Sequence, residues 1–352
     1  MIQLRRFALL PALMLLLFSP AISHAQHYTH IVVFGDSLSD TGNDANLSNA
    51  AYGFYFPGPI FDYTAGRFTD GYDTVPHATN YKGVWVEQLA AMLPFKPAVT
   101  NSLDGGQDYA YGFAFTGGGT TFFVFDSSPP YYAITIDNVD LQITHYLATN
   151  PKIDDKTLFV VWAGANDVLN ATTTSEIVTA GTNQAADIER LISAGATQFV
   201  VPNLPPLGAI PRLNTTIYAP GVTAESVLYN STLAQGLDIV QDANSDKHLR
   251  IYPLDVFALF NKIIASPASF GLVDVTDSSQ GNSTVNPDTY LFWDGLHPTT
   301  HGHNIVAVTA DEKIKHHQCM ADPKRDGWDR DHDGGAADAE WGCLLTYGDH
   351  GN

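Results

Sequence analysis

Residues 30–38 have the sequence HIVVFGDSL, and this stretch decides the fold class. From Ile31 to Phe34 the run is apolar and rich in β-branched residues, and Gly35 ends it. A run without polar alternation predicts a strand that is buried on both faces of a sheet. A second run of the same kind, LFVVWA at residues 158–163, ends at Gly164. Each run is followed at once by polar residues.

Strand-like and helix-like segments alternate along the rest of the chain. This alternation predicts an α/β fold in which helices cover both faces of a mostly parallel sheet. In such sheets ligands bind at the carboxyl ends of the strands, which here carry Gly35–Leu38 and Gly164–Asp167. We expect Ala51–Lys82 and Asn101–Tyr132 to be irregular. The further strands are predicted at 198–201 and 248–252, and the helices at 83–93, 175–194, 223–243, 256–264 and 300–315.

Composition excludes several classes of protein. The chain has 352 residues, with 17 Lys and Arg against 37 Asp and Glu, and a formal charge of −20. This excess of acid disfavours a nucleic-acid partner, because phosphate contacts need a basic face. It also disfavours adsorption to anionic lipid. Two cysteines are too few for a disulfide scaffold.

The N-terminus has the pattern of an export signal. Arg5 and Arg6 precede an apolar run from Phe7 to Phe18, and Ser23–Ala25 supplies small residues for cleavage. We therefore predict a signal peptide over residues 1–25 and a secreted or periplasmic mature chain without a transmembrane segment. The alternative is a retained membrane anchor, for which the apolar run is short.

Three polar groups are candidates for chemistry. Ser37 follows the first strand, Asn166 follows the second, and Asp294 and His297 lie three residues apart in DGLHP at 294–298. A serine hydroxyl becomes a nucleophile when a histidine accepts its proton, and a carboxylate can orient that histidine. Alternatively, Ser37 and Asn166 are helix caps and Asp294 stabilises a turn.

Taken together, these segments resemble the GDSL esterase and lipase family, also called SGNH hydrolases. The matching blocks are FGDSLSDTGN at 34–43, GAND at 164–167 and DGLHP at 294–298, and the resemblance runs from about residue 31 to 314. It implies a three-layer α/β/α fold with a flavodoxin-like sheet over a hydrolase domain at 26–318. It also implies hydrolysis of carboxylic esters without a cofactor for catalysis.

The resemblance implies a role for each matching residue. Ser37 is the nucleophile, His297 the general base, and Asp294 the residue that orients it. The oxyanion donors are the N–H of Ser37, the side-chain amide of Asn166 and a glycine N–H from a further block.

This chain departs from the family in that further block. The segment DYAYGFA at 108–114 fits without a gap but places Phe113 at the donor position. The segment TGGGTT at 116–121 keeps the glycine pair, so we predict Gly118 as the donor and Gly112 as the second choice.

Arg67 lies in GRFTDG at 66–71, which resembles a segment of the longer family members. We expect it to tie a loop to a carboxylate rather than to contact substrate, because arginine forks often join loops.

The substrate has two candidates. The resemblance to longer bacterial members implies a phospholipase A or lysophospholipase, with aromatic loops at 52–56, 61–63 and 122–125 that hold an acyl chain and touch a lipid surface transiently. The alternative is a carbohydrate O-acetylesterase of the same fold, and the aromatic residues can equally be ordinary loop packing. In another class, the chain is a non-catalytic, calcium-dependent binding protein.

Residues 319–352 form a polar, acid-rich appendage. The sequence DRDHDG at 329–334, followed by five residues and then Glu340, fits an EF-hand loop, which predicts a structural calcium ion. A solvated acidic tail is the alternative. Cys319 and Cys343 bracket the loop and are predicted to form a disulfide, with free thiols as the alternative. The predicted calcium ligands are Asp329, Asp331, Asp333, the carbonyl of Gly335, and Glu340.

Overall fold

The computed structural model describes residues 28–64, 66–70, 81–126 and 131–320. The predicted signal peptide, the calcium loop and Cys343 lie outside these ranges, so they stay predictions from sequence. Within these ranges, no helix combines the length and the apolar character that crossing a bilayer requires.

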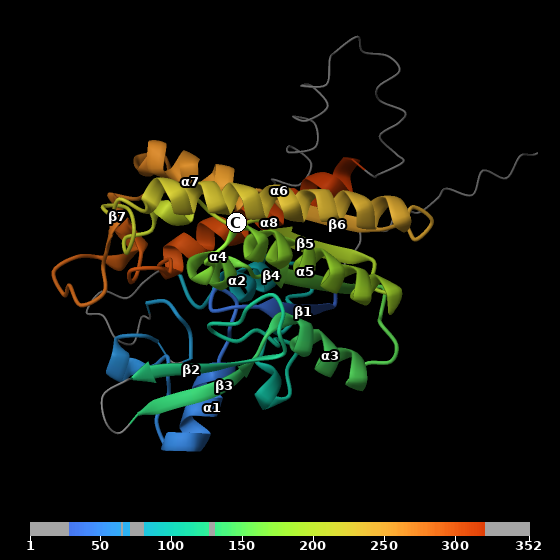
Figure 1. Ribbon diagram of the computed structural model, residues 1–352, viewed down its shortest axis with the longest axis horizontal. Helices are drawn as coiled ribbons and strands as arrows, with labels where there is room; N and C mark the ends of the chain where they lie inside the picture. The colour runs from blue at the N-terminus through green and yellow to red at the C-terminus, as the bar shows by residue number, and fades with distance from the viewer. Residues whose placement is uncertain (1–27, 65, 71–80, 127–130, 321–352) are drawn as a thin grey trace, which may run out of the picture. The chain divides into compact units, whose positions relative to one another are not determined.

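A parallel sheet forms the centre of the fold (Figure 1). Its strands are β1 (His30–Gly35), β4 (Thr157–Trp162), β5 (Gln198–Pro202) and β6 (Arg250–Leu254), in the order β1-β4-β5-β6. Each adjacent pair is parallel, and β1 pairs with β4 along its whole length. The predicted α/β fold is therefore confirmed.

An irregular segment extends the sheet beyond β1. The N–H of Val33 donates to the carbonyl of Gln107 at 3.0 Å, and the N–H of Tyr109 donates back to the carbonyl of Val33 at 2.8 Å. Val33 and Asp108 form an isolated parallel bridge. β1 therefore has this segment on one side and β4 on the other. Neighbours on both sides of the first strand are typical of the strand order of a flavodoxin-like sheet.

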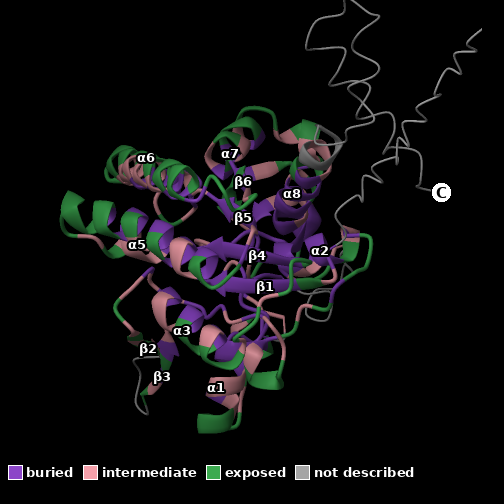
Figure 2. Cartoon of the chain, turned by 90° about the vertical axis from the view of Figure 1, so that its right-hand side faces the viewer, coloured by how far each residue is buried: buried purple, intermediate pink, exposed green. Residues whose placement is uncertain are grey.

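Alternate residues of β1 enter two separate cores. Ile31 and Val33 pack with residues of α2 (Trp85–Met92), α7 (Val256–Ala265) and α8 (Thr300–Met320). Val32 and Phe34 pack with residues of α3 (Val139–Thr149), α5 (Thr174–Ser193) and α6 (Ala219–Ala243). Figure 2 shows the buried strands between these two helical layers. Side chains of a strand alternate between faces, so this division produces three layers.

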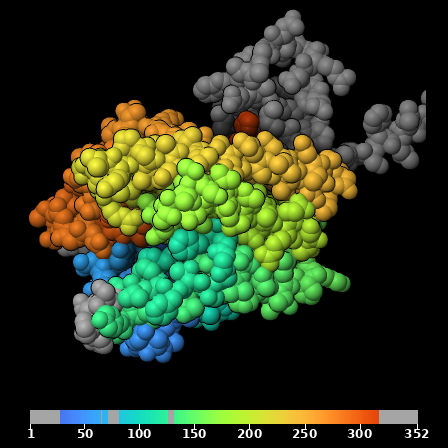
Figure 3. All heavy atoms as spheres, viewed as in Figure 1, coloured from blue at the N-terminus to red at the C-terminus, as the bar shows by residue number. Residues whose placement is uncertain are grey.

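Helices α5 and α6 lie against each other over the face of the sheet that carries Val32 and Phe34. The Tyr229 ring of α6 reaches the sheet, where its hydroxyl donates to the carbonyl of Ala163 at 2.9 Å. Figure 3 shows α6, in yellow, lying against α5, in green. Helix α6 begins at Ala219, four residues before the predicted start, because Pro220 is tolerated in a first helical turn.

One prediction of irregular structure was wrong. Within 101–132, strand β2 (Thr120–Asp126) pairs with β3 (Tyr132–Asp137) as an antiparallel hairpin. Neighbouring glycines and prolines obscured its alternation, in which Phe122 and Val124 are exposed. Further elements are α1 (Asn43–Tyr52), α4 (Ala165–Asn170), β7 (Asp274–Ser278), β8 (Tyr290–Phe292) and the single-turn 3₁₀ helices Pro59–Phe61, Ser102–Asp104, Leu207–Ala209, Pro267–Phe270 and Pro287–Thr289.

The sheet brings two predicted site segments to one edge. Gly35 at the end of β1 pairs with Trp162 at the end of β4, so Ser37 and Asn166 leave the sheet side by side. A Cβ atom at Gly35 would lie 2.3 Å from the carbonyl oxygen of Trp162. The close approach of these two strands therefore requires glycine at position 35.

Candidate active site

A chain of hydrogen bonds joins Ser37, His297 and Asp294. Ser37 Oγ lies 2.9 Å from His297 Nε2, and His297 Nδ1 lies 2.7 Å from Asp294 Oδ2. With the ring proton on Nδ1, His297 donates to Asp294 and accepts from the Ser37 hydroxyl. Residues 260 positions apart in sequence thus form the arrangement that activates a serine nucleophile.

A tight turn sets the spacing of the acid and the imidazole. Asp294 Oδ1 accepts from the backbone N–H groups of Leu296 at 2.7 Å and His297 at 2.6 Å, which leaves Oδ2 to face the ring. Only 8% of Asp294 and 5% of His297 is exposed. Burial alone raises the pKa of Asp294, but the His297 ring and these hydrogen bonds outweigh it and hold the pKa below its usual value. Asp294 is therefore an ionised acceptor.

Sequence reasoning missed a second side chain on Asp294. The hydroxyl of Tyr63 donates to Asp294 Oδ2 at 2.5 Å. Tyr63 lies in the stretch predicted to be irregular, and no local pattern marks one tyrosine of an aromatic loop as a neighbour of a residue more than 200 positions away.

Asn166 lies beside the same cavity as Ser37 and His297. Its side-chain Nδ2 donates to the carbonyl of Ala114 at 3.1 Å. The following residue, Asp167, accepts from the backbone N–H and the hydroxyl of Thr116 at 3.0 and 2.8 Å. The segment around residues 114–116 is therefore fixed against the end of β4.

The two glycines predicted as donors differ in their surroundings. Gly118 has a φ of 95° and lies in a turn near the start of α3, where Asn138 Nδ2 donates to the carbonyl of Gly117 at 3.0 Å. The N–H of Gly112 donates to Asp40 Oδ2 at 3.2 Å. Neither glycine is among the described residues that line the cavity beside Ser37. The contacts of this site thus give no support to Gly118 or Gly112.

Phe113 has the backbone conformation of a glycine. Its φ is 64°, in the left-handed region that bulky residues rarely adopt. Among the described residues, nothing accepts a hydrogen bond from its N–H. It directly precedes Ala114, the residue that contacts Asn166. The signal in the sequence was the gap-free alignment, which placed Phe113 at the donor position.

The cavity beside Ser37 is small and apolar. It holds about 30 Å³, while a single water needs roughly 10–15 Å³. The polar groups Ser37, Asn166 and His297 lie at its wall. Its apolar lining includes Leu38, Trp162, Ala165, Pro205, Leu207, Ile210, Phe260, Phe292, Leu296 and Pro298.

Comparison with known proteins agrees with this geometry. A sequence model of the family described as GDSL-like lipase/acylhydrolase matches residues 31–308. The chain belongs to this family. GDSL esterase/lipase 6 of Arabidopsis thaliana is 24% identical over 343 residues, which cover 86% of this chain and 92% of that protein. The match with the phosphatidylcholine-sterol acyltransferase of Aeromonas hydrophila is 27% identical over 263 residues, which cover 73% of this chain and 67% of that protein.

Among solved structures, an acetylxylan esterase from Geobacillus stearothermophilus aligns with a TM-score of 0.42 and 13% identity, covering 82% of this chain and 95% of that one. The family assignment confirms that the chain is an ester-bond hydrolase.

In this GDSL hydrolase a chain of aromatic rings starts at the histidine. The Phe68 ring lies 5.1 Å from the His297 ring and 5.5 Å from the Phe113 ring, measured between centroids. Phe113 in turn stacks on Phe123 of the hairpin. An aromatic wall thus runs from His297 to β2.

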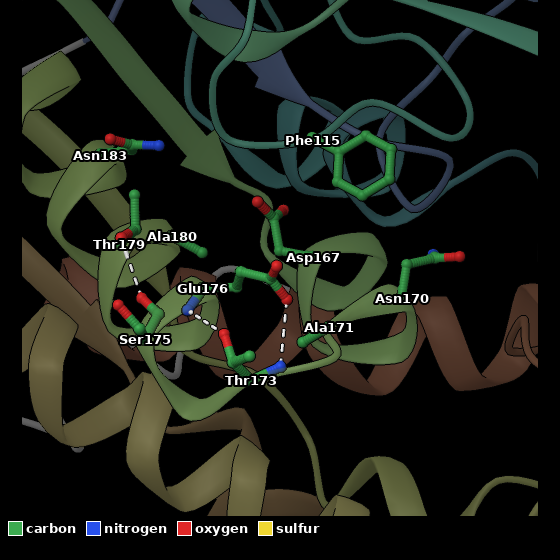
Figure 4. A pocket seen from close by; sticks show the side chains of 10 residues that line it. All are labelled: Phe115, Asp167, Asn170, Ala171, Thr173, Ser175, Glu176, Thr179, Ala180 and Asn183. Atoms are coloured by element: carbon green, nitrogen blue, oxygen red, sulfur yellow. Dashed lines mark hydrogen bonds between the residues drawn. The ribbon is translucent and has the colours of Figure 1, made fainter.

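A larger groove of about 500 Å³ lies next to Asp167 (Figure 4). In Figure 4 the Phe115 ring and Asp167 are drawn next to each other among its lining residues. Its acids are already engaged by the fold, because Asp167 binds Thr116 and Glu176 accepts from the N–H of Thr173 at 3.1 Å as a helix cap. This groove therefore adds no reactive group to the site.

Arg67 plays the predicted structural role. Its guanidinium lies 2.6 Å from Glu87 Oε1, and its Nε donates to Oε2 at 3.2 Å. This fork joins the loop around residue 67 to the start of α2.

Two buried acids follow the nucleophile. Asp40 accepts from the N–H groups of Gly42 and Asn43 at 2.7 Å, and burial raises its pKa to about 6 against the effect of these bonds. Both carboxyl oxygens of Asp44 are buried without a hydrogen-bond partner among the described residues. Burial, followed by the charge of Asp40, raises the pKa of Asp44 well above its usual value.

Asp44→Asn is expected to stabilise the protein at pH 7 by about 1–3 kcal/mol and to have little effect near pH 3. When the pKa of a carboxyl is higher in the folded than in the unfolded state, the free energy of unfolding falls as the pH rises above the unfolded pKa of about 4. Asparagine does not ionise, so the variant has no such fall. Urea unfolding at both pH values measures the difference.

The matched control is Asp40→Asn, which removes an acceptor of several backbone N–H groups and should destabilise the protein. Equal effects of the two substitutions at pH 7 would contradict this assignment.

Proposed function

We propose that this GDSL hydrolase cleaves carboxylic esters through an acyl-enzyme on Ser37. The observation that carries the proposal is the 2.9 Å contact between Ser37 Oγ and His297 Nε2, with Asp294 behind the ring. His297 takes the hydroxyl proton while Oγ attacks the carbonyl carbon, and then returns that proton to the departing alcohol. Water, deprotonated by the same nitrogen, releases the acid and restores Ser37. No cofactor takes part in these proposed steps.

The proposed oxyanion site combines the N–H of Ser37 with the amide of Asn166. For the third donor we propose the N–H of Phe113. The N–H of Gly112 is held by Asp40, whereas that of Phe113 meets no acceptor among the described residues. Phe113 also directly precedes Ala114, the residue that contacts Asn166, which favours it over Gly118. Such donors stabilise the charge that develops on the attacked carbonyl.

A lysophospholipid or phospholipid is the substrate class that we propose. The aromatic wall continues the apolar surroundings of His297 toward the hairpin, and the Aeromonas relative is a phosphatidylcholine-sterol acyltransferase. Around it Phe122, Ile60 and Tyr131 are 71%, 68% and 67% exposed. Residues 43–66 and 113–137 contain no Lys or Arg. These features suit transient contact with a neutral rather than an anionic lipid surface.

A short acyl group on a sugar is the second candidate. The cavity of about 30 Å³ beside Ser37 has room for little more than the methyl group of an acetyl ester. A longer chain must extend beyond this cavity. The two candidates therefore differ in where the acyl group lies.

A substrate panel separates these candidates. Lysophosphatidylcholine, dipalmitoyl phosphatidylcholine, p-nitrophenyl acetate and acetylated xylan should be compared by kcat/KM. We expect lysophosphatidylcholine to exceed acetylated xylan by at least tenfold, and the reverse order would establish the acetylesterase. In parallel, a fluorophosphonate probe should label the Ser37 peptide. A well-folded protein without labelling or turnover would favour the non-catalytic binding protein.

We also propose that the protein is exported and that its C-terminal tail binds calcium. Mass spectrometry of the protein recovered from periplasm or medium should give a chain that begins at Gln26. Both proposals rest on sequence patterns alone.

Chelation of calcium is expected to lower the melting temperature by several degrees, because an ion that binds only the folded tail stabilises it. Glu340→Ala should abolish this effect, since that residue is the predicted distal ligand. As a control, Glu312→Ala in the exposed part of α8 should leave the effect of chelator intact. Melting curves of the wild type that coincide with and without chelator would remove the calcium proposal.

A further inference from the structure

Tyr63 shares one carboxylate oxygen with the histidine. Asp294 Oδ2 accepts from the Tyr63 hydroxyl at 2.5 Å and faces His297 Nδ1 at 2.7 Å. Asp294 Oδ1 is occupied by two backbone N–H groups of its own turn. Among the described residues, Tyr63 is thus the side chain from outside this turn that donates to the carboxylate.

The phenol acts only as a donor in this contact. Burial, together with the charge of Asp294, raises the pKa of Tyr63 well above its usual value. The hydroxyl therefore keeps its proton over the whole working range. A hydrogen bond from it to an ionised carboxylate is of the stronger kind, because the acceptor is charged.

The surrounding segment holds Tyr63 in place. The Tyr63 N–H donates to the carbonyl of Gly58 at 3.1 Å, and Gln280 Nε2 donates to the carbonyl of Phe61 at 3.0 Å. The Tyr63 ring lies 5.9 Å from Phe68, the ring that packs on His297. The aromatic wall and the carboxylate are therefore joined through one side chain.

We propose that Tyr63 is a positioning residue of the esterase reaction: it fixes Oδ2 of Asp294 and takes up part of its charge, and thereby sets both the orientation of His297 and the pH range in which the ring accepts the Ser37 proton. This inference rests on the proposed function and adds a residue to it. Without the phenol, Oδ2 directs its full charge at the ring, so the acid limb of kcat should move to higher pH.

Other titratable groups also face this site. Asp36 at the end of β1 interacts with the charge of His297, and burial raises the pKa of Asp36 to about 7. Burial, followed by the charge of His297, lowers the pKa of His303 of α8 to about 3, so His303 stays neutral. Asp62 lies close enough to Tyr63 to interact with it electrostatically. Because Asp36 titrates in the measured range, the test compares variants rather than absolute midpoints.

The direct test is Tyr63→Phe, which removes the hydroxyl and keeps the ring. We expect kcat on p-nitrophenyl acetate to fall about 3- to 30-fold with KM unchanged within twofold. The acid limb of kcat should move up by about 0.5–1 pH unit. Tyr55→Phe is the matched control, because Tyr55 belongs to the same segment but is exposed. It should leave both quantities unchanged.

A double-mutant cycle tests whether Tyr63 acts through the carboxylate. In an Asp294→Asn background, Tyr63→Phe should cause no further shift of the acid limb. Gln280 contacts both the carbonyl of Phe61 and the Tyr63 phenol, and it does not touch Asp294. Gln280→Ala should therefore shift the limb in the same direction by less, and it decides the matter if Tyr63→Phe fails to fold.

Two results would overturn the inference: an unchanged acid limb in the folded variants, or an effect of Tyr63→Phe that persists without Asp294. If a fluorophosphonate labels Ser37 of the wild type, the proposed function stands even when Tyr63 fails this test. Absence of labelling would count against the proposed function itself.

Discussion

Ser37→Ala is expected to lower kcat by about 10⁴- to 10⁶-fold, the largest effect of any single substitution in this chain. Alanine cannot form the acyl-enzyme, and His297 then has no hydroxyl proton to accept. The remaining rate comes from the oxyanion donors acting on water, so it should not fall to the uncatalysed level. Single-turnover kinetics with p-nitrophenyl acetate should show that the burst of the wild type is absent. KM should change little, because Ser37 Oγ contributes mainly to the reaction step.

Ser39→Ala provides the control from the same turn. Ser39 Oγ accepts from Trp85 Nε1 at 3.1 Å inside the core, away from the histidine. Its loss leaves a buried indole N–H without a partner and should lower stability by about 1–3 kcal/mol, with kcat of the folded protein within a few-fold of wild type. A Ser37→Ala protein that keeps more than about a hundredth of the activity would remove Ser37 as the nucleophile.

Asn166→Ala is expected to lower kcat by about 10²- to 10³-fold, the second largest effect, which corresponds to about 3–4 kcal/mol of transition-state stabilisation. One N–H of the amide is held by the carbonyl of Ala114. That contact orients the side chain at the wall of the cavity beside Ser37, and the other N–H is left to meet the oxyanion. Because this bond strengthens as charge develops, kcat should fall much more than KM rises. Steady-state kinetics on a soluble ester measure both.

Asn183→Ala is the matched control for the amide. Asn183 Nδ2 donates to Thr116 Oγ1 at 3.4 Å, in the segment 114–116 that Asn166 also contacts. Asn183 does not line the cavity beside Ser37. Its removal should change kcat by less than a few-fold. Adding Asn166→Ala to Ser37→Ala tests the same idea from the other side, since the residual rate should fall again if the amide stabilises an oxyanion. Equal kinetics for Asn166→Ala and Asn183→Ala would show that the amide serves only the loop.

Local patterns were enough to predict the frame of the site. The apolar runs before Gly35 and Gly164 carry their own strand signal, and a parallel sheet necessarily brings the carboxyl ends of its strands to one edge. The DGLHP turn likewise contains, within five residues, the carboxylate and the imidazole that it positions. These patterns made Ser37, Asp294 and His297 candidates, and the resemblance to the GDSL family implied their roles.

Contacts between distant segments decided the rest. Gly118 was predicted because TGGGTT keeps the family's glycine pair, and only the structure places this loop against the start of α3, where the carbonyl of Gly117 accepts from Asn138. A phenylalanine at φ 64° violates its own propensity, so no local rule predicts it. The same holds for the hairpin, whose strand signal was hidden by its glycines and prolines.

The sequence by itself determined the sheet, the order of the catalytic segments and the chemistry that their side chains offer, because periodicity and turn composition act over a few residues. Only the tertiary structure decided which tyrosine meets Asp294, and which backbone N–H groups and buried carboxyl oxygens lack a partner among the described residues. These properties depend on packing between segments hundreds of residues apart, where burial and hydrogen bonding are settled by neighbours that no local pattern specifies.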